Sequence, residues 1–108
     1  MYYFDPIERQ STELAPGVLA RTFWGDKMLM SVVEFLPGAT VPDHSHAHEQ
    51  VGIVLEGELT MTIGDQTKVL RPGDVYVIPG DVEHNAKAEG GPAKVLDIFS
   101  PVRDEYKY

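Results

Sequence analysis

The chain has 108 residues, which is enough for one hydrophobic core and too few for two, so we expect a single domain over residues 1–108. Hydrophobic residues make up 43% of the chain and aromatic residues 9%, a composition that is typical of a folded protein and excludes a disordered one. Seventeen acidic residues against nine basic ones give a net charge of −8. This charge argues against a nucleic-acid surface, because phosphate contacts need clustered lysine and arginine.

Other absences narrow the class of protein further. There are no cysteines, so the chain has neither a disulfide framework nor a thiolate nucleophile. The first ten residues lack the basic start and apolar run of a signal peptide. No apolar stretch approaches the ~20 residues that are needed to cross a bilayer. We therefore expect a cytoplasmic protein that does not bind membranes.

Ten glycines and eight prolines interrupt the chain, and the segments between them have the pattern of short strands. Residues 58–63 alternate strictly between polar and apolar side chains, and Gly64-Asp65 fits a two-residue hairpin turn. Residues 75–78 and 94–99 are almost continuously apolar, which predicts strands buried on both faces. Many short strands with turns at this spacing indicate an all-β antiparallel sandwich or barrel. The predicted strands are residues 28–36, 58–63, 67–70, 75–78 and 94–99.

Histidines occupy alternate positions at His44, His46 and His48, and Gln50 follows them. In a strand, His44 and His46 would point to the same side about 6.6 Å apart, close enough to bind one metal ion. His48 would lie about 13 Å from His44, so the chain must bend after His46 before residue 48 or 50 can complete a site. The alternation of side chains along a strand does not decide whether His48 or Gln50 is that ligand. His84 follows a Pro-Gly-Asp turn and can supply a ligand from a second strand.

A simpler interpretation exists, because a pair of histidines in a loop is often no more than polar surface. Four histidines in 108 residues do not decide the question by their number. A histidine at the mouth of another strand favours the metal site, and the spacing of the surrounding glycines decides for it.

That spacing resembles the two sequence motifs of the cupin superfamily. The first motif is matched over residues 38–57, which begin and end with glycine and contain the His-x-His pair and the glutamine. The second is matched over residues 73–84, which begin with glycine and contain Pro79 and His84. A spacer of 15 residues separates the two motifs, as in small microbial cupins. The resemblance implies a small antiparallel β-barrel, a jelly-roll-like double-stranded β-helix with a metal in its lumen.

The resemblance also implies a ligand set for one divalent transition metal, formed by His44, His46, Gln50 and His84. The chain departs from the family pattern where Gln50 replaces the usual glutamate and where Asp81 and Ala88 replace a glycine and an asparagine. Because an amide is neutral, the ion keeps its full positive charge, which favours Lewis-acid chemistry over redox chemistry. Zinc, nickel, iron and manganese all suit imidazole and amide ligands, so the sequence does not choose among them.

Within the cupins, the string HSHAHEQVGIVLEGEL and the ending VLDIFSPVRDEY resemble the small cupins of pectin and uronate breakdown. Members of that group convert 4,5-unsaturated uronate monomers into the open-chain keto acid, and their metal set is three histidines and a glutamine. Their important residues include an aspartate, a phenylalanine and an arginine with the spacing of Asp97, Phe99 and Arg103. The resemblance implies a metal-dependent isomerase of pectin or alginate catabolism that acts on a small sugar acid.

These three residues suit such a reaction. Asp97 is a lone carboxylate in an apolar strand, where burial would raise its pKa into a range useful for moving a proton during ring opening and tautomerisation. Phe99 would form an apolar wall, and Arg103 would bind the substrate carboxylate through two hydrogen bonds. Asp97 could instead lie at the solvent edge of its strand. Arg103 could instead form a surface ion pair with Asp104, Glu105 or Asp5.

Two other functions fit the same fold. One is an iron- or manganese-dependent dioxygenase, which would consume oxygen and would not need Arg103. The other is a non-catalytic cupin that binds metal or sugar. Exposed edge strands in so small a barrel favour a homodimer, and aromatic residues are expected at a barrel end or in the dimer interface. These aromatic residues are Tyr2, Tyr3, Phe4, Phe23 and Trp24.

Overall fold

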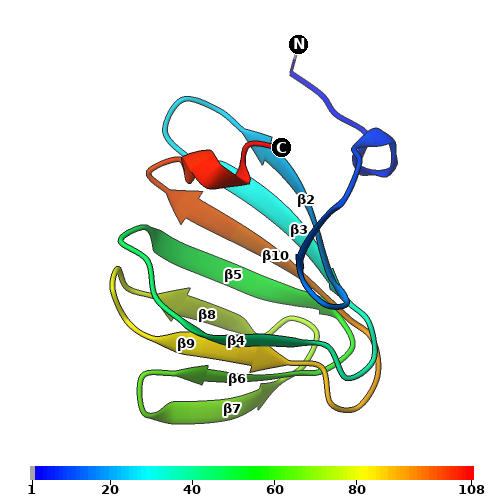
Figure 1. Cartoon of the computed structure of the whole chain (residues 1–108), viewed down its shortest axis with the longest axis vertical. Coiled ribbons are helices and arrows are strands. Elements are labelled where there is room, and N and C mark those ends of the chain that lie inside the picture. Colours follow the sequence, from blue (N-terminus) through cyan, green and yellow to red (C-terminus); the bar gives the residue numbers. More distant parts are fainter. Residues whose placement is uncertain (1) are drawn as a thin grey trace.

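The computed structural model describes residues 2–108, which form ten β-strands and two short 3₁₀ helices (Figure 1). The helices are η1 (Pro6–Glu8) and η2 (Asp104–Tyr106), and neither is long and apolar enough to span a membrane. The strands are β1 (Thr12–Ala15), β2 (Val18–Trp24), β3 (Leu29–Phe35), β4 (Thr40–His44), β5 (Glu49–Glu56), β6 (Leu59–Ile63), β7 (Gln66–Leu70), β8 (Val75–Ile78), β9 (His84–Lys87) and β10 (Ala93–Ser100).

The strands form two antiparallel sheets that enclose the core between them (Figure 1). One sheet has the order β1-β2-β3-β10-β5-β8, and the other has the order β4-β9-β6-β7. The consecutive strands β4 and β5 belong to different sheets, so the segment between them crosses from one sheet to the other. The all-β antiparallel prediction is confirmed. Within residues 2–108 no strand pairing joins the two sheets, so the expected barrel is an open sandwich rather than a closed cylinder.

The hairpin of β6 and β7 follows directly from the local sequence. Ile63 pairs with Gln66, which leaves Gly64 and Asp65 as a two-residue turn. Gly64 has a φ of 59°, a conformation that glycine adopts without steric cost and that suits the first turn position. The alternation expected for residues 58–63 places the apolar Leu59 and Met61 in the core. The predicted hairpin is confirmed.

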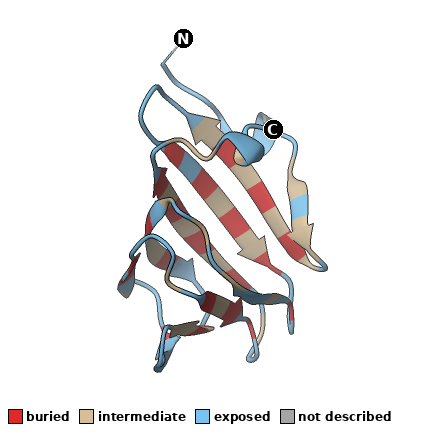
Figure 2. Cartoon of the chain, turned by 60° about the vertical axis from the view of Figure 1, so that its left-hand side comes forward, coloured by how far each residue is buried: buried red, intermediate tan, exposed pale blue. Residues whose placement is uncertain are grey.

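The expectation that residues 75–78 and 94–99 are buried on both faces is wrong. In β8, Tyr76 and Ile78 are buried, whereas Val75 is 69% and Val77 58% exposed. In β10 the buried residues alternate with half-buried ones, and Figure 2 shows this alternation as bands along the strands. The reason is that each sheet packs on the core with one face only, so even an apolar strand has an outer side.

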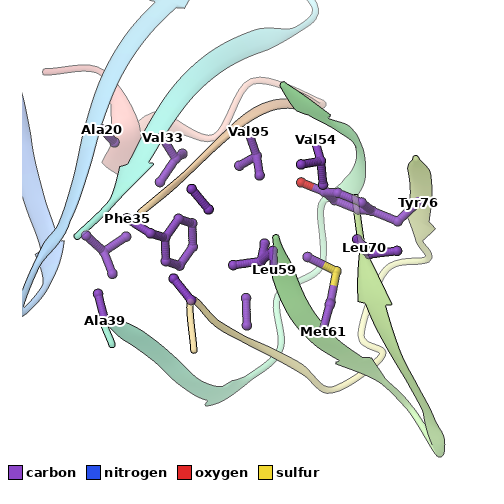
Figure 3. Packing of buried hydrophobic residues seen from close by; sticks show 14 of the residues in the cluster. Ala20, Val33, Phe35, Ala39, Val54, Leu59, Met61, Leu70, Tyr76 and Val95 are labelled. Atoms are coloured by element: carbon purple, nitrogen blue, oxygen red, sulfur yellow. The ribbon is translucent and has the colours of Figure 1, made fainter. Parts of the chain in front are cut away.

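Apolar side chains from both sheets fill one part of the interior (Figure 3). Along β10 the inward-facing residues begin with Ala93 and Val95, which belong to this core. The next inward-facing residue is Asp97, and Phe99 follows it. The interior therefore changes from an apolar core to a polar region along a single strand, and the polar region holds the candidate site.

Candidate metal centre

Three histidines converge at the polar end of the interior. His44 is the last residue of β4 and pairs across the sheet with His84, the first residue of β9. His46 lies in the connection between β4 and β5. One ring nitrogen from each histidine lies within 4.8 Å of the other two, a group that could hold a metal ion.

The expectation that His44 and His46 share one strand is wrong, because β4 ends at His44 and the chain then crosses to the other sheet. The crossing segment is held by a hydrogen bond of 2.7 Å from the backbone N–H of Asp81 to the carbonyl of His46. Asp81 has a φ of 66°, which explains why glycine is usual at this position and why aspartate, one of the residues that tolerate this conformation, can replace it. The change of sheet therefore brings His46 to His84.

The hydrogen bonds of the three rings leave the same nitrogen of each available to a metal. Nδ1 of His44 lies 2.9 Å from the Pro42 carbonyl, and Nδ1 of His84 lies 2.9 Å from the Val82 carbonyl. Nδ1 of His46 lies 2.9 Å from the carbonyl of His48. A carbonyl only accepts hydrogen bonds, so each Nδ1 carries the hydrogen and each neutral ring directs an Nε2 lone pair outward. This arrangement is usual for metal-binding histidines.

Gln50, rather than His48, stands beside this cluster. Its side-chain oxygen lies 3.1 Å from Nε2 of His46, and the residue is buried. With Nδ1 of His46 protonated, the neutral ring and the amide oxygen present lone pairs to each other, which is favourable only where a cation or a proton lies between them. Nε2 of His84 is buried without a hydrogen-bond partner among residues 2–108. The donor set therefore fits a metal ion, and His48 lies outside the three-histidine group.

Burial lowers the pKa of both His46 and His84, and the nearby charge of Arg103 lowers the pKa of His46 further. A lowered pKa favours the neutral imidazole, which is the form that binds a metal. The lowered pKa values and the hydrogen bonds at Nδ1 thus both indicate neutral imidazole rings that can bind a metal through Nε2.

Asp97 is buried in the interior, so the alternative that places it at the solvent edge is wrong. Burial raises the pKa of its carboxyl from 3.8 to about 6, against the opposing effects of hydrogen bonds from Tyr76 and Gln50 and of the charge on Arg103. A carboxylate accepts hydrogen bonds only, so the amide N–H of Gln50 is the donor in their bond. Gln50 therefore contacts Asp97 through its nitrogen and His46 through its oxygen.

Tyr76 holds the same carboxyl from the other side. Its hydroxyl donates a hydrogen bond of 2.5 Å to Oδ1 of Asp97, and its ring extends from β8 into the core (Figure 3). The two residues lie on strands separated by β5, where Gly52 pairs with both of them. A Cβ atom at Gly52 would lie 2.5 Å from Oδ1 of Asp97 and closer still to the hydroxyl and ring of Tyr76. Gly52 is therefore required for this bond to pass over β5.

Arg103 combines both of its expected environments. Its Nε donates to Glu105 at 2.9 Å, as in the ion-pair alternative, yet its side chain is only 12% exposed. The guanidinium lies over the rings of Tyr106 and Phe99, with 3.9 and 5.1 Å from its central carbon to the ring centroids. Phe99 is buried and packs edge-on against His46. Of the three guanidinium nitrogens of Arg103, only Nε donates a hydrogen bond to another of residues 2–108. The two Nη groups therefore remain available for a ligand.

Most of these residues line one cavity, which has an enclosed volume of about 50 Å³ and opens to solvent. Six of its lining residues are His44, Gln50, His84, Asp97, Phe99 and Arg103.

Sequence reasoning missed the three residues with hydroxyl groups that line the cavity, Ser31, Tyr76 and Tyr106. Tyr76 could have been found from the sequence, because a tyrosine in a buried strand needs a hydrogen-bond partner for its hydroxyl. No feature of the sequence marks Ser31 or Tyr106 as part of the site, since their positions depend on strand register and on how the C-terminal segment packs.

A family model for the cupin domain matches residues 31–99. The chain belongs to the cupin family. This cupin is similar to the pectin degradation protein KdgF of Dickeya dadantii, with 28% identity over 106 residues that cover 96% of each chain. Among solved structures it is similar to KdgF from Halomonas sp., with a TM-score of 0.89, 29% identity and 97% of each chain covered. An RmlC-like cupin from Shewanella frigidimarina gives a TM-score of 0.91 at 25% identity, over 98% of this chain and 96% of that one.

Proposed function

We propose that this cupin is a metal-dependent isomerase that converts 4,5-unsaturated uronate monomers into the open-chain keto acid, as part of pectin or alginate breakdown. The observation that carries the proposal is the meeting of three unlike groups in one cavity. His44, His84 and Gln50, the buried carboxyl of Asp97 and the guanidinium of Arg103 all line it, and His46 lies beside His44 and His84. The similarity to KdgF proteins over nearly the whole chain supports it.

His44, His46, Gln50 and His84 would hold one divalent transition metal. Their neutral donors suit zinc, nickel, iron or manganese. When bound, such an ion supplies a Lewis acid that polarises oxygen atoms of the sugar.

The remaining residues have separate roles. Arg103 binds the substrate carboxylate through its Nη groups, and Phe99 forms the apolar wall beside the sugar ring. Asp97 takes the proton of the anomeric hydroxyl while the bond between C1 and the ring oxygen breaks, which leaves an aldehyde and an enolate. Asp97 then returns this proton to C4, and the enolate becomes a ketone. The reaction rearranges the substrate without gain or loss of atoms, and a carboxyl pKa of about 6 suits proton transfer in both directions near neutral pH.

The test is an NMR time course of 4,5-unsaturated galacturonate with the metal-loaded protein. We expect conversion faster than the spontaneous rate for the wild type and at the spontaneous rate for His44→Ala. His48→Ala is the matched control, because His48 belongs to the same segment and lies outside the three-histidine group. Conversion at the spontaneous rate by the wild type would refute the proposal, and oxygen uptake would then test for a dioxygenase.

We also propose that the protein is a homodimer. The outer face of the six-stranded sheet exposes apolar side chains from neighbouring strands, although the chain carries a net charge of −8. Contiguous exposed apolar surface of this kind marks interaction sites, and a second copy would cover β8 at the edge of the sheet. The exposed residues of this face include Met30, Val51, Leu55, Val75 and Val77.

A further inference from the structure

A row of buried residues crosses the six-stranded sheet beside the metal centre. Strand register makes Thr22, Ser31, Asp97, Gly52 and Tyr76 successive partners on β2, β3, β10, β5 and β8. The four members with side chains are at least 92% buried, and all four carry polar atoms. Beside them in the interior lies the apolar core, so each polar atom in the row needs a partner.

Every member of the row except Ser31 has that partner. The hydroxyl of Thr22 donates to the carbonyl of Tyr106 at 2.6 Å, and the hydroxyl of Tyr76 donates to Asp97. Ser31 is 0% exposed, and its hydroxyl has no hydrogen-bond partner among residues 2–108. A buried hydroxyl without a partner destabilises the fold, and alanine would fill this place on β3 without that cost.

The position of Ser31 in the cavity indicates which group its hydroxyl can bind. Ser31 lines the same cavity as His44, His84 and Arg103. It is the direct cross-strand partner of Asp97, so the two Cβ atoms lie about 4.5–5.5 Å apart and their side chains face the same space. An oxygen atom that hydrogen-bonds to Asp97 from the cavity is therefore within reach of Ser31 as well.

We infer that Ser31 is a substrate-contact residue, whose hydroxyl hydrogen-bonds to a hydroxyl or ring oxygen of the sugar acid next to Asp97. The inference rests on the proposed function, to which it adds a residue that selects for polyhydroxylated substrates. A serine hydroxyl suits this task because it both donates and accepts and rotates to fit its partner. A site with a buried polar group discriminates strongly against a ligand that leaves the group unpaired.

The test compares Ser31→Ala with Thr22→Val in the metal-loaded protein. Thr22 is the matched control, because it is the neighbour of Ser31 in the row, is equally buried and has a satisfied hydroxyl. Three quantities are measured: the Tm, the KM for 4,5-unsaturated galacturonate and the Kd for D-galacturonate, a stable sugar acid. For Ser31→Ala we expect a Tm equal to or above that of the wild type and a rise of about tenfold in KM and Kd. For Thr22→Val we expect a lower Tm with KM and Kd within twofold of the wild type.

The outcomes separate this inference from the proposed function. If the wild type converts the substrate and Ser31→Ala leaves KM and Kd unchanged, the inference is wrong and the proposed function stands. If Ser31→Ala lowers the Tm as Thr22→Val does and changes neither constant, the hydroxyl has a structural partner and the inference is also wrong. If the wild type binds D-galacturonate without converting the substrate, and Ser31→Ala weakens that binding, the inference stands and the isomerase is wrong. If the wild type neither binds nor converts a sugar acid, both are wrong.

Discussion

The substitution Gly52→Ala tests the central contact of the site, because Gly52 lies between the two residues that it joins. The added Cβ would lie 2.5 Å from Oδ1 of Asp97 and closer to Tyr76. Real Cβ contacts lie about 1 Å or more beyond this, so the tyrosine ring or the carboxyl must move by roughly that distance. The 2.5 Å bond between Tyr76 and Asp97 then breaks.

Two effects contribute to the expected loss of stability. Forcing one methyl group into a packed interior costs about 1–3 kcal/mol, and leaving a buried donor without its acceptor costs about the same. Because the two effects share one movement, we expect a total of about 2–4 kcal/mol rather than their full sum. We also expect a loss of at least about 100-fold in conversion rate, since a shift of 1 Å in a reacting group has effects of this size.

Urea unfolding measures the first effect, and the NMR time course measures the second. Gly25→Ala is the matched control, because a Cβ at Gly25 meets nothing within 4 Å and its backbone is not in the left-handed region. That variant should stay within about 0.5 kcal/mol of the wild type. If Gly52→Ala and Gly25→Ala are equally stable and equally active, Tyr76 and Asp97 do not meet over β5, and the hydrogen bond between them does not position the carboxyl.

Three further predictions concern the site and the outer face. Gln50→Glu should keep bound metal, as measured by metal analysis, yet convert substrate at least tenfold more slowly than the wild type. The reason is that a carboxylate does not donate a hydrogen bond to Asp97 and partly neutralises the ion. Turnover at the wild-type rate would contradict this prediction. In the metal-free protein, the raised pKa of Asp97 means that the folded state keeps a proton that the unfolded state loses. The contribution of Asp97 to stability should therefore fall by up to about 3 kcal/mol as the pH rises from 3.8 to about 6 and then level off, and urea series measure it as the difference between the wild type and Asp97→Asn. Replacing both Val75 and Val77 by Glu should convert a dimer into a monomer in light-scattering measurements, while Lys68→Glu, at an exposed position on β7, should remain dimeric; a monomeric wild type would refute the homodimer.

Features that depend on neighbouring residues were predictable from the sequence. The turn at Gly64 and the alternation before it determine the β6–β7 hairpin, because both act within a few residues. The motif spacing likewise led to the three histidines that the structure brings together. The strand assumed for His46 was wrong because residue parity describes a strand only while it continues, and no local signal shows that the chain leaves its sheet after His44.

Features that depend on strand register were not predictable. Tyr76, Gly52 and Asp97 are far apart in the sequence, and they meet only because β8, β5 and β10 are neighbours in one particular alignment. A shift of one residue in any of these pairings would turn a member of the row to the opposite face. The outer faces of the apolar strands were misjudged for a related reason, since composition alone does not say how many sides of a sheet are covered.

The same register explains why this cupin has glutamine where the family motif usually has glutamate. Asp97 faces the interior close to residue 50, and a second carboxylate there would lie beside a like charge in a buried site. An amide avoids this conflict because its two ends differ: the nitrogen donates to Asp97, and the oxygen turns to Nε2 of His46. Tyr76 fixes the far side of the carboxyl, and Gly52 leaves room for that bond. A chain of contacts thus runs from β8 through Asp97 and Gln50 to the histidines, so the orientation of the neutral ligand and the position of the proton-transfer group depend on each other.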